Sequence, residues 1–173
     1  MECHDCRLPI DEKAHHDHGR GSIVICCDCF DEEIGRHPSK RRHPRPIVKP
    51  AALLIRDKKF LVARTQGKSH FYAVGGKLEP GETDIQCLHR EVMEEIGCHI
   101  TSERYYRTFV GPSADNQKTV VMICFFVELD REPTPSSEIE ELLWADSRTT
   151  KDVIGSLLHD YVIPALKTDS LVN

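Results

Sequence analysis

The segment from Gly76 to Cys98 constrains the fold more than any other part of the chain. It reads GKLEPGETDIQCLHREVMEEIGC, which predicts a loop followed by a helix. The helix should start near Thr83, because Thr83 and Gln86 have the spacing of a capping box. It should end at Gly97, because glycine commonly follows the last turn of a helix. At about 100° per residue, four apolar residues form a stripe that should face the core: Ile85, Leu88, Val92 and Ile96.

A second stripe of this helix is acidic. Glu91, Glu94 and Glu95 stand at positions i, i+3 and i+4, where each like-charged pair destabilises an isolated helix by roughly 0.2–0.5 kcal/mol. They also lie in the second half of the helix, where the macrodipole disfavours negative charge. A divalent cation would account for this arrangement, because Mg²⁺ prefers oxygen ligands. The alternative is a solvated acidic face with Arg90 and Lys77 as counter-charges.

The spacing of fixed residues around this helix resembles the signature of the Nudix hydrolase family. Five residues separate Gly76 from Glu82, and seven more precede the sequence REVMEEIGC. Every fixed position of the signature matches: Gly76, Glu82, Arg90, Glu91, Glu94, Glu95 and Gly97. The resemblance extends over residues 50–168 and implies an α/β/α sandwich with a mixed sheet. One departure is Val74, where many relatives have proline; it affects the path into the loop and removes no catalytic group.

The resemblance also implies an enzyme, a pyrophosphohydrolase that cleaves a pyrophosphate bond in a nucleoside diphosphate derivative. Arg90 and Glu82 would interact and hold the loop against the helix, and a water molecule would attack a phosphorus atom. Mg²⁺ or Mn²⁺ would be bound by four groups: the side chains of Glu91, Glu94 and Glu95 and the backbone carbonyl of Gly76.

In relatives the general base is often a glutamate from a loop after the central strands, so the resemblance implies that it comes from the acidic turn that precedes Trp144. Glu138, Glu140 and Glu141 are the candidates, and we favour Glu138 because it begins the acidic run nearest the turn. Arg64 closes a predicted strand near the signature loop, where relatives often carry a basic residue that contacts a phosphate of the substrate. An exposed acidic turn and a surface arginine are the alternatives.

The sequence does not distinguish among three classes of substrate: nucleoside triphosphates, ADP-ribose and nucleotide sugars. Several aromatic residues could stack on a base, although such residues are more often part of the core: Phe71, Tyr72, Tyr105, Tyr106 and Phe109.

Apolar runs separated by turn signals predict that residues 50–173 form one mixed α/β domain. The polar pair Asp57-Lys58 should join the first two strands, and Pro164 should bend or shorten the last helix. We expect strands at residues 51–56, 59–63, 71–74, 105–110, 119–129 and 142–145, and a last helix over residues 150–167.

Paired cysteines mark residues 1–34 as a second module. Nineteen residues separate Cys3-x-x-Cys6 from Cys26-x-x-Cys29, which is the spacing of a zinc ribbon with four cysteine ligands. A piece this short has too small a core to fold alone, and Zn²⁺ would stabilise it. Cys27 or a histidine could replace one ligand, and free thiols in an unstructured arm are the alternative.

Residues 35–49 should form an extended, solvated linker. They contain three prolines, six Lys or Arg residues and no acidic residue. Proline lacks a backbone hydrogen-bond donor and the like charges repel one another, so this composition favours an extended chain. The alternative is that the ribbon and this basic linker bind nucleic acid, in a nucleotide-sensing or RNA 5′-end-processing protein. The ribbon could also pack against a second subunit in a homodimer.

The overall composition excludes other classes of function. The formal net charge of −5 gives no sign of non-specific nucleic-acid binding. No apolar run approaches the roughly 18 residues of a transmembrane helix, and the polar start MECHDC does not resemble a secretory signal. We therefore expect a cytoplasmic protein, without a membrane partner, that acts on a small-molecule nucleotide.

The cysteine spacing generates a direct prediction. Protein purified without chelator should contain about one equivalent of zinc, because four thiolates close the tetrahedral shell of one ion. Elemental analysis of the purified chain checks this, and less than about half an equivalent would contradict a structural site.

Overall fold

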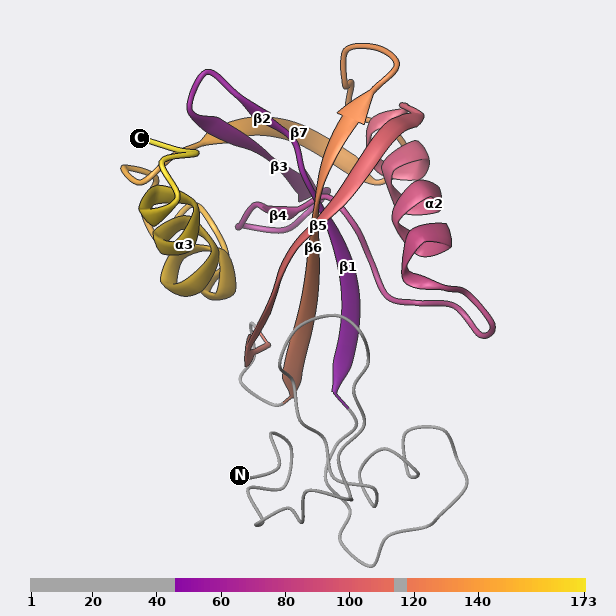
Figure 1. The fold of residues 1–173 in the computed structure, drawn as a ribbon, viewed down its shortest axis with the longest axis horizontal. Coiled ribbons are helices and arrows are strands. Elements are labelled where there is room, and N and C mark those ends of the chain that lie inside the picture. Colours follow the sequence, from indigo (N-terminus) through magenta and orange to yellow (C-terminus); the bar gives the residue numbers. More distant parts are fainter. Residues whose placement is uncertain (1–45, 114–117) are drawn as a thin grey trace, which may run out of the picture.

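A computed structural model describes residues 46–113 and 118–173 (Figure 1). The predicted zinc ribbon at residues 1–34 and linker residues 35–45 lie outside this part of the chain. The strands are β1 (Ile47–Leu53), β2 (Ile55–Arg56), β3 (Lys59–Thr65), β4 (Tyr72–Ala73), β5 (Ile100–Pro112), β6 (Thr119–Leu129) and β7 (Ile139–Ala145). The helices are α2 (Asp84–Ile96), the π-helical segment η2 (Leu158–Val162) and α3 (Ile163–Thr168).

The strands form two sheets with helices on either side. In one sheet β6 is central, with β1 parallel to it on one side and β5 antiparallel on the other. In the second sheet β3 pairs antiparallel with β2, β4 and β7. Figure 1 shows α2 and α3 on opposite sides of the strands. The predicted α/β fold with a mixed sheet, and the prediction that residues 119–129 form a central strand, are confirmed.

Alternation along β1 divides the apolar core into two clusters. Ala51 and Leu53 belong to the cluster that includes η2 and α3, whereas Ala52 belongs to the cluster that includes α2. Successive side chains of a strand point to opposite faces, so one strand contributes to both cores. β6 does the same, since Met122 and Ile123 lie in different clusters.

Helix α2 begins and ends where the sequence predicts. The capping box of Thr83 and Gln86 is present, and Gly97 follows the last turn in the left-handed conformation with φ 66°. Of the predicted apolar stripe, Leu88, Val92 and Ile96 are buried, but Ile85 is exposed, which corrects the expectation for that residue. Ile85 lies in the first turn, and the buried residues there are Asp84 and Cys87. The last turn contains no basic residue.

The predicted linker extends too far, because residues 47–49 belong to β1. The prolines and basic residues of segment 35–49 predict a linker, but its last three residues are part of a strand. The strand continues through Pro50, which fits it without loss of a sheet hydrogen bond. Ala52 N donates to Val74 O, on the side away from β6, and Pro50 lies two residues earlier, so its missing N–H would face the same side. The domain therefore begins at least at Ile47.

The hairpin turn is confirmed, whereas the last helix begins later than predicted. Asp57 and Lys58 have φ of 50° and 59° and connect β2 to β3. Residues 151–153 form a turn and Ile154 pairs with Phe71 in an isolated β-bridge, in place of the first turns of a helix. The π-helical segment η2 ends two residues before Pro164, which cannot donate a backbone hydrogen bond to the preceding turn.

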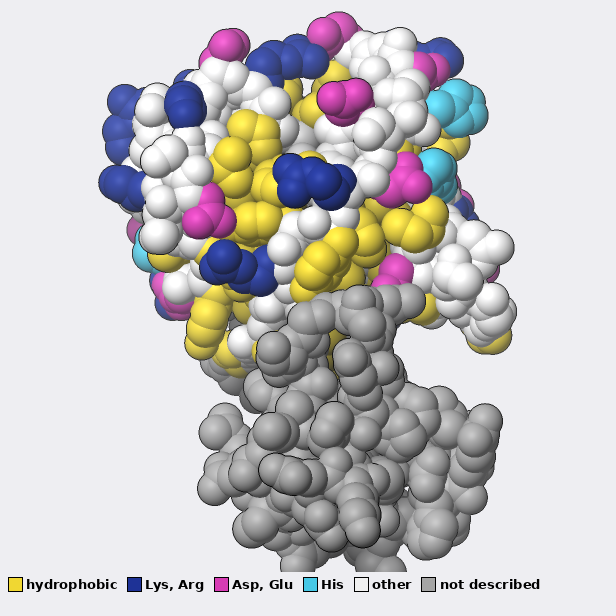
Figure 2. Space-filling model, viewed as in Figure 1, with side chains coloured by type: hydrophobic (Ala, Val, Ile, Leu, Met, Phe, Trp, Pro, Cys, Tyr) yellow, Lys and Arg dark blue, Asp and Glu magenta, His cyan; other side chains and the backbone are white. Residues whose placement is uncertain are grey.

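Hydrophobic and basic side chains mix on the face drawn in Figure 2. On β5 and β6, the guanidinium of Arg104 lies over the ring of Phe126 at 4.8 Å, and that of Arg107 lies over Tyr106 at 5.2 Å. These cation–π contacts cover aromatic rings that the sheet leaves half-buried. No helix in the described residues is long and apolar enough to cross a membrane.

The packing of α2 predicts a large difference between two truncations in the same helix. Leu88→Ala should lower the free energy of unfolding by about 2–5 kcal/mol, because it leaves a cavity at a fully buried position. Ile85→Ala should change it by less than about 0.5 kcal/mol, because that side chain is exposed. Urea denaturation measures both, and similar losses would contradict the observed orientation of α2.

Candidate functional site

Two glycines allow the loop before α2 to lie against its neighbours. A Cβ at Gly75, which has φ 133°, would lie 2.2 Å from the carbonyl oxygen of Pro50 in β1. A Cβ at Gly76 would lie 2.0 Å from Oε1 of Glu91. The Gly75 N–H donates to Oε2 of Glu95 at 2.8 Å. The loop backbone is therefore in direct contact with two of the three signature glutamates.

Arg90 holds the loop and the helix together, as the resemblance implied. Its Nε and Nη2 atoms donate to the two carboxylate oxygens of Glu82 at 2.7 and 2.8 Å. Nη2 also donates to the Lys77 carbonyl at 3.2 Å, and Nη1 donates to Glu91 at 2.7 Å. The hydrogen bonds from Arg90 hold the pKa of Glu82 at about 2. A two-point arginine–carboxylate contact fixes orientation as well as charge.

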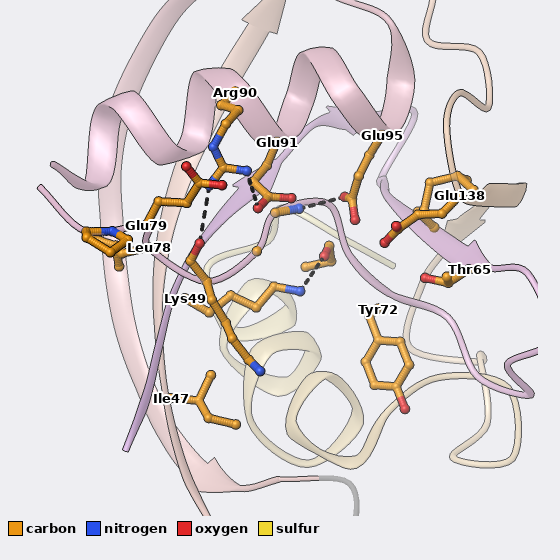
Figure 3. A pocket seen from close by; sticks show the side chains of 17 residues that line it. Ile47, Lys49, Thr65, Tyr72, Leu78, Glu79, Arg90, Glu91, Glu95 and Glu138 are labelled. Carbon is orange, nitrogen blue, oxygen red and sulfur yellow. Dashed lines mark hydrogen bonds and ion pairs between the residues drawn. The ribbon is translucent and has the colours of Figure 1, made fainter. Parts of the chain in front are cut away.

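A cavity of about 540 Å³ opens beside this loop (Figure 3). Glu91 and Glu95 reach it from α2, and Glu138 reaches it from the segment before β7. Glu94 does not line the cavity: its side chain is 53% exposed and pairs with Arg90 at 3.2 Å. The structure thus brings together two of the three predicted carboxylate ligands, Gly76 and the predicted general base.

Glu95 is the carboxylate whose charge is least stabilised by its surroundings. Its pKa is raised to about 7, chiefly by burial and also by the neighbouring carboxylates of Glu91 and Glu138. The charge of Lys49 and the hydrogen bond from Gly75 act in the opposite direction but do not cancel the effect of burial. A carboxylate that is costly to ionise in the folded protein is one that a cation would stabilise.

The donor chemistry around Gly76 and the glutamates fits a hard divalent cation. All candidate ligands are oxygen atoms, as Mg²⁺ and Mn²⁺ prefer. The absence of a side chain at Gly76 leaves room for the Glu91 carboxylate against the loop. No cluster of three or more His, Cys, Asp or Glu side chains stands ready to hold a metal within residues 46–113 and 118–173. Glu91 instead accepts a hydrogen bond from Arg90, Glu95 accepts one from the Gly75 N–H, and Glu94 is exposed and pairs with Arg90.

The structure does not bring Arg64 into the cavity, contrary to its predicted contact with substrate. Its neighbours Ala63 and Thr65 line the cavity, so the intervening side chain points to the opposite face of β3. Arg64 donates instead to Glu140 at 2.9 Å and to Glu141 at 2.6 Å. Pairing of β3 with β7 shifts register between Arg64 and Thr65, so that both glutamates reach one guanidinium.

Sequence reasoning missed two residues of the cavity wall as site residues. Lys49 was assigned to the linker, although a lysine among the alternating residues Ile47, Ala51 and Leu53 was a signal. Tyr72 is one of five aromatic residues that the sequence offers for stacking on a base, without singling it out, and it lines the cavity. A Cβ at Gly155 would lie 2.7 Å from Cε1 of Tyr72, so this glycine lets the ring pack against the backbone. The predicted zinc ligands Cys3, Cys6, Cys26 and Cys29 lie outside the described residues.

Known proteins resemble this chain in sequence and in fold. An NAD-capped RNA hydrolase, NudC of Chromobacterium violaceum, is 31% identical over 66% of this chain and 44% of its own length. The human 8-oxo-dGDP phosphatase NUDT18 is 33% identical over 49% of this chain and 27% of its own length. The chain thus spans less than half the length of these curated relatives. The MutT protein of Methanosarcina mazei Go1 shares the fold, with a TM-score of 0.62, 21% identity, and coverage of 75% of this chain and 99% of that protein.

A family model places the candidate site within a known domain. The NUDIX domain model matches residues 46–155. These residues include the loop, all of α2, the cavity and the strand β1 that the linker prediction had divided. The match covers more than half of the chain and contains every signature residue, so the chain belongs to the Nudix family.

Proposed function

We propose that this protein hydrolyses a pyrophosphate bond in a nucleoside diphosphate derivative, with Mg²⁺ or Mn²⁺ as cofactor. The observation that carries the proposal is the convergence of Glu91, Glu95 and Glu138 on one cavity beside Gly76. The cavity volume of about 540 Å³ is within the range of small-molecule sites. The carboxylates of Glu91, Glu95 and Glu138 would repel a phosphate placed beside them unless a cation were bound, which agrees with a metal-dependent reaction on a phosphorylated substrate.

The residues divide into metal ligands and supporting residues. Glu91, Glu94, Glu95 and the carbonyl of Gly76 are the proposed ligands. When bound, a divalent cation would supply charge neutralisation at the phosphate oxygens and a lowered pKa of bound water. Arg90 orients Glu91 through its hydrogen bond and holds the loop through Glu82.

Glu138 is the proposed general base. In the reaction, an oxygen–phosphorus bond forms from water, the bond from phosphorus to the bridging oxygen breaks, and Glu138 accepts the proton of the water. Glu140 and Glu141 are poorer candidates, because both are ion-paired with Arg64 and lie outside the cavity wall. Glu138 lines the cavity and forms no ion pair with any residue in the described part of the chain.

The substrate class is proposed as a nucleoside triphosphate, ADP-ribose or a nucleotide sugar. A second candidate is RNA 5′-end processing, favoured by the similarity to relatives named NAD-capped RNA hydrolases. In that case residues 1–34, with a structural zinc ion on Cys3, Cys6, Cys26 and Cys29, would grip the RNA together with the basic linker. Removal of the linker charges would then weaken activity on capped RNA more than activity on free dinucleotides.

A hydrolysis screen with Mg²⁺ and Mn²⁺ tests the proposal. It should cover damaged and normal nucleoside triphosphates, ADP-ribose, NADH, nucleotide sugars and NAD-capped RNA. Wild-type protein should hydrolyse at least one class, and Glu95→Gln should lower kcat by at least about 100-fold, because it removes a charged metal ligand. Thermal unfolding should confirm that the variant is folded, and wild-type turnover by folded Glu95→Gln would contradict the assigned role.

The general base has a matched control in the same acidic turn. Glu138→Gln should lower kcat by roughly 100-fold or more, which is within the range for loss of general base catalysis. Glu140→Gln should retain kcat within about threefold, because it alters only the ion pair with Arg64 on the other face of β3. Equal losses in the two variants would argue against Glu138 as the base.

Cation affinity should depend on pH through Glu95. Its pKa of about 7 lies above the usual value of 4.5, so a proton competes with the metal below about pH 7. In the metal-free protein the same shift favours the protonated form, so stability declines as the pH rises from about 4.5 to about 7.

Mn²⁺ titration at pH 6 and pH 8 measures the competition between the proton and the metal at Glu95. The dissociation constant of wild type should be severalfold larger at pH 6. Glu103→Gln, an exposed change on β5 outside the cavity, should behave like wild type, whereas Glu95→Gln should bind weakly at both values. Equal affinity of wild type at the two pH values would refute the competition.

A further inference from the structure

Lys49 is a charged residue in a row of β1 that is otherwise apolar. Ile47, Ala51 and Leu53 share its face of the strand, and the two latter residues are buried in the core cluster that includes α3. Lys49 pairs in register with Met122 of β6, which is also buried. A lysine at such a position loses hydration without improving the packing, so its retention calls for a polar partner.

Within residues 46–113 and 118–173, the Lys49 ammonium has one hydrogen-bond partner. Nζ donates to the carbonyl oxygen of Ala73 in β4 at 3.3 Å, and an ammonium group has three hydrogens. No carboxylate among the described residues lies within ion-pair distance of Nζ, since Lys49 forms none of the ion pairs found there. Nζ therefore has donor capacity beyond this one hydrogen bond, and its side chain lines the cavity.

The side chain lies in the cavity wall, on the side of the cavity away from helix α2. Figure 3 shows Lys49 extending below Glu91 and Glu95, so that the ammonium and the carboxylates border the same space. The charges that act on Lys49 most strongly are those of Glu95 and then Glu91. These are the carboxylates proposed to hold a cation, and a cation there would leave Lys49 without compensating negative charge.

We propose that Lys49 is a substrate-binding residue whose Nζ donates hydrogen bonds to a phosphate oxygen of the nucleotide. Lysine binds phosphate as a compact charge with freely rotating donors, which suits a group reached from only one side. A phosphate drawn to a cation at Glu91 and Glu95 would bring negative charge into the space that Lys49 borders. The inference rests on the proposed function of the same cavity.

A comparison of two lysine variants tests this. Lys49→Met removes the charge and keeps the length of the side chain, and Lys59→Met does the same at a half-buried lysine of β3 outside the cavity wall. The probe is imidodiphosphate, the non-hydrolysable analogue of pyrophosphate, titrated calorimetrically with Mg²⁺ present. Lys49→Met should weaken its binding by roughly 10- to 100-fold, the usual range for loss of a charged hydrogen bond, and Lys59→Met by less than about twofold.

Two further readouts separate substrate binding from a structural role. The melting temperature of Lys49→Met should equal or exceed that of wild type, because methionine suits an apolar face better than lysine does. Mn²⁺ affinity measured without imidodiphosphate should be unchanged or tighter, because a positive charge near the carboxylates has been removed. Where a substrate is turned over, KM should rise more than kcat falls.

The outcomes that overturn the inference are distinct. Unchanged imidodiphosphate affinity in Lys49→Met would refute it, as would a loss of affinity accompanied by weaker Mn²⁺ binding or a lower melting temperature. Failure of wild type to bind imidodiphosphate would refute it as well. If wild type binds the probe in a Lys49-dependent manner yet hydrolyses nothing in the screen, the inference stands and the proposed enzymatic function fails.

Discussion

The close approach of the Gly75-Gly76 backbone to β1 and to helix α2 is the constraint on which the site depends. A side chain at Gly75 would strike the carbonyl of Pro50, and one at Gly76 would strike the carboxylate of Glu91. Without this approach, Glu95 would lose its hydrogen bond from the loop and Glu91 would lose its place against it. The arginine–glutamate contact of Arg90 and Glu82 maintains the same geometry from the far side of the loop.

The parts of the structure that follow from local chemistry could be predicted from the sequence. The capping box at Thr83, the glycine after the last turn of α2 and the hairpin turn at Asp57-Lys58 each depend on residues a few positions apart. The mixed α/β fold followed from a resemblance with several fixed identities, which the family model and the solved structures support. Glu91, Glu95 and Glu138 share one cavity, although they come from distant parts of the chain.

The errors occurred where pairing between distant strands decides the outcome. Residues 47–49 look like a linker until β6 pairs with them, and Pro50 is tolerated only because its N–H would face away from that partner. Arg64 looked like a phosphate ligand until the register shift against β7 gave it Glu140 and Glu141. Ile85 was placed on the core face by angle alone, although the loop before α2 determines what covers the first turn. None of these features is encoded within one local stretch of sequence.

The acidic end of helix α2 links chemistry to the mechanics of the fold. Its last turn holds two glutamates and no basic residue, so like-charge repulsion and the helix dipole both act against the end of the helix that carries Glu95. An ion that entered for catalysis would also slow the transient opening of that end. The helix would consequently be most rigid in the metal-bound protein. A substitution that relieved the repulsion would stabilise the metal-free protein but lower its affinity for the ion. In this helix, thermal robustness and catalytic competence cannot be improved independently.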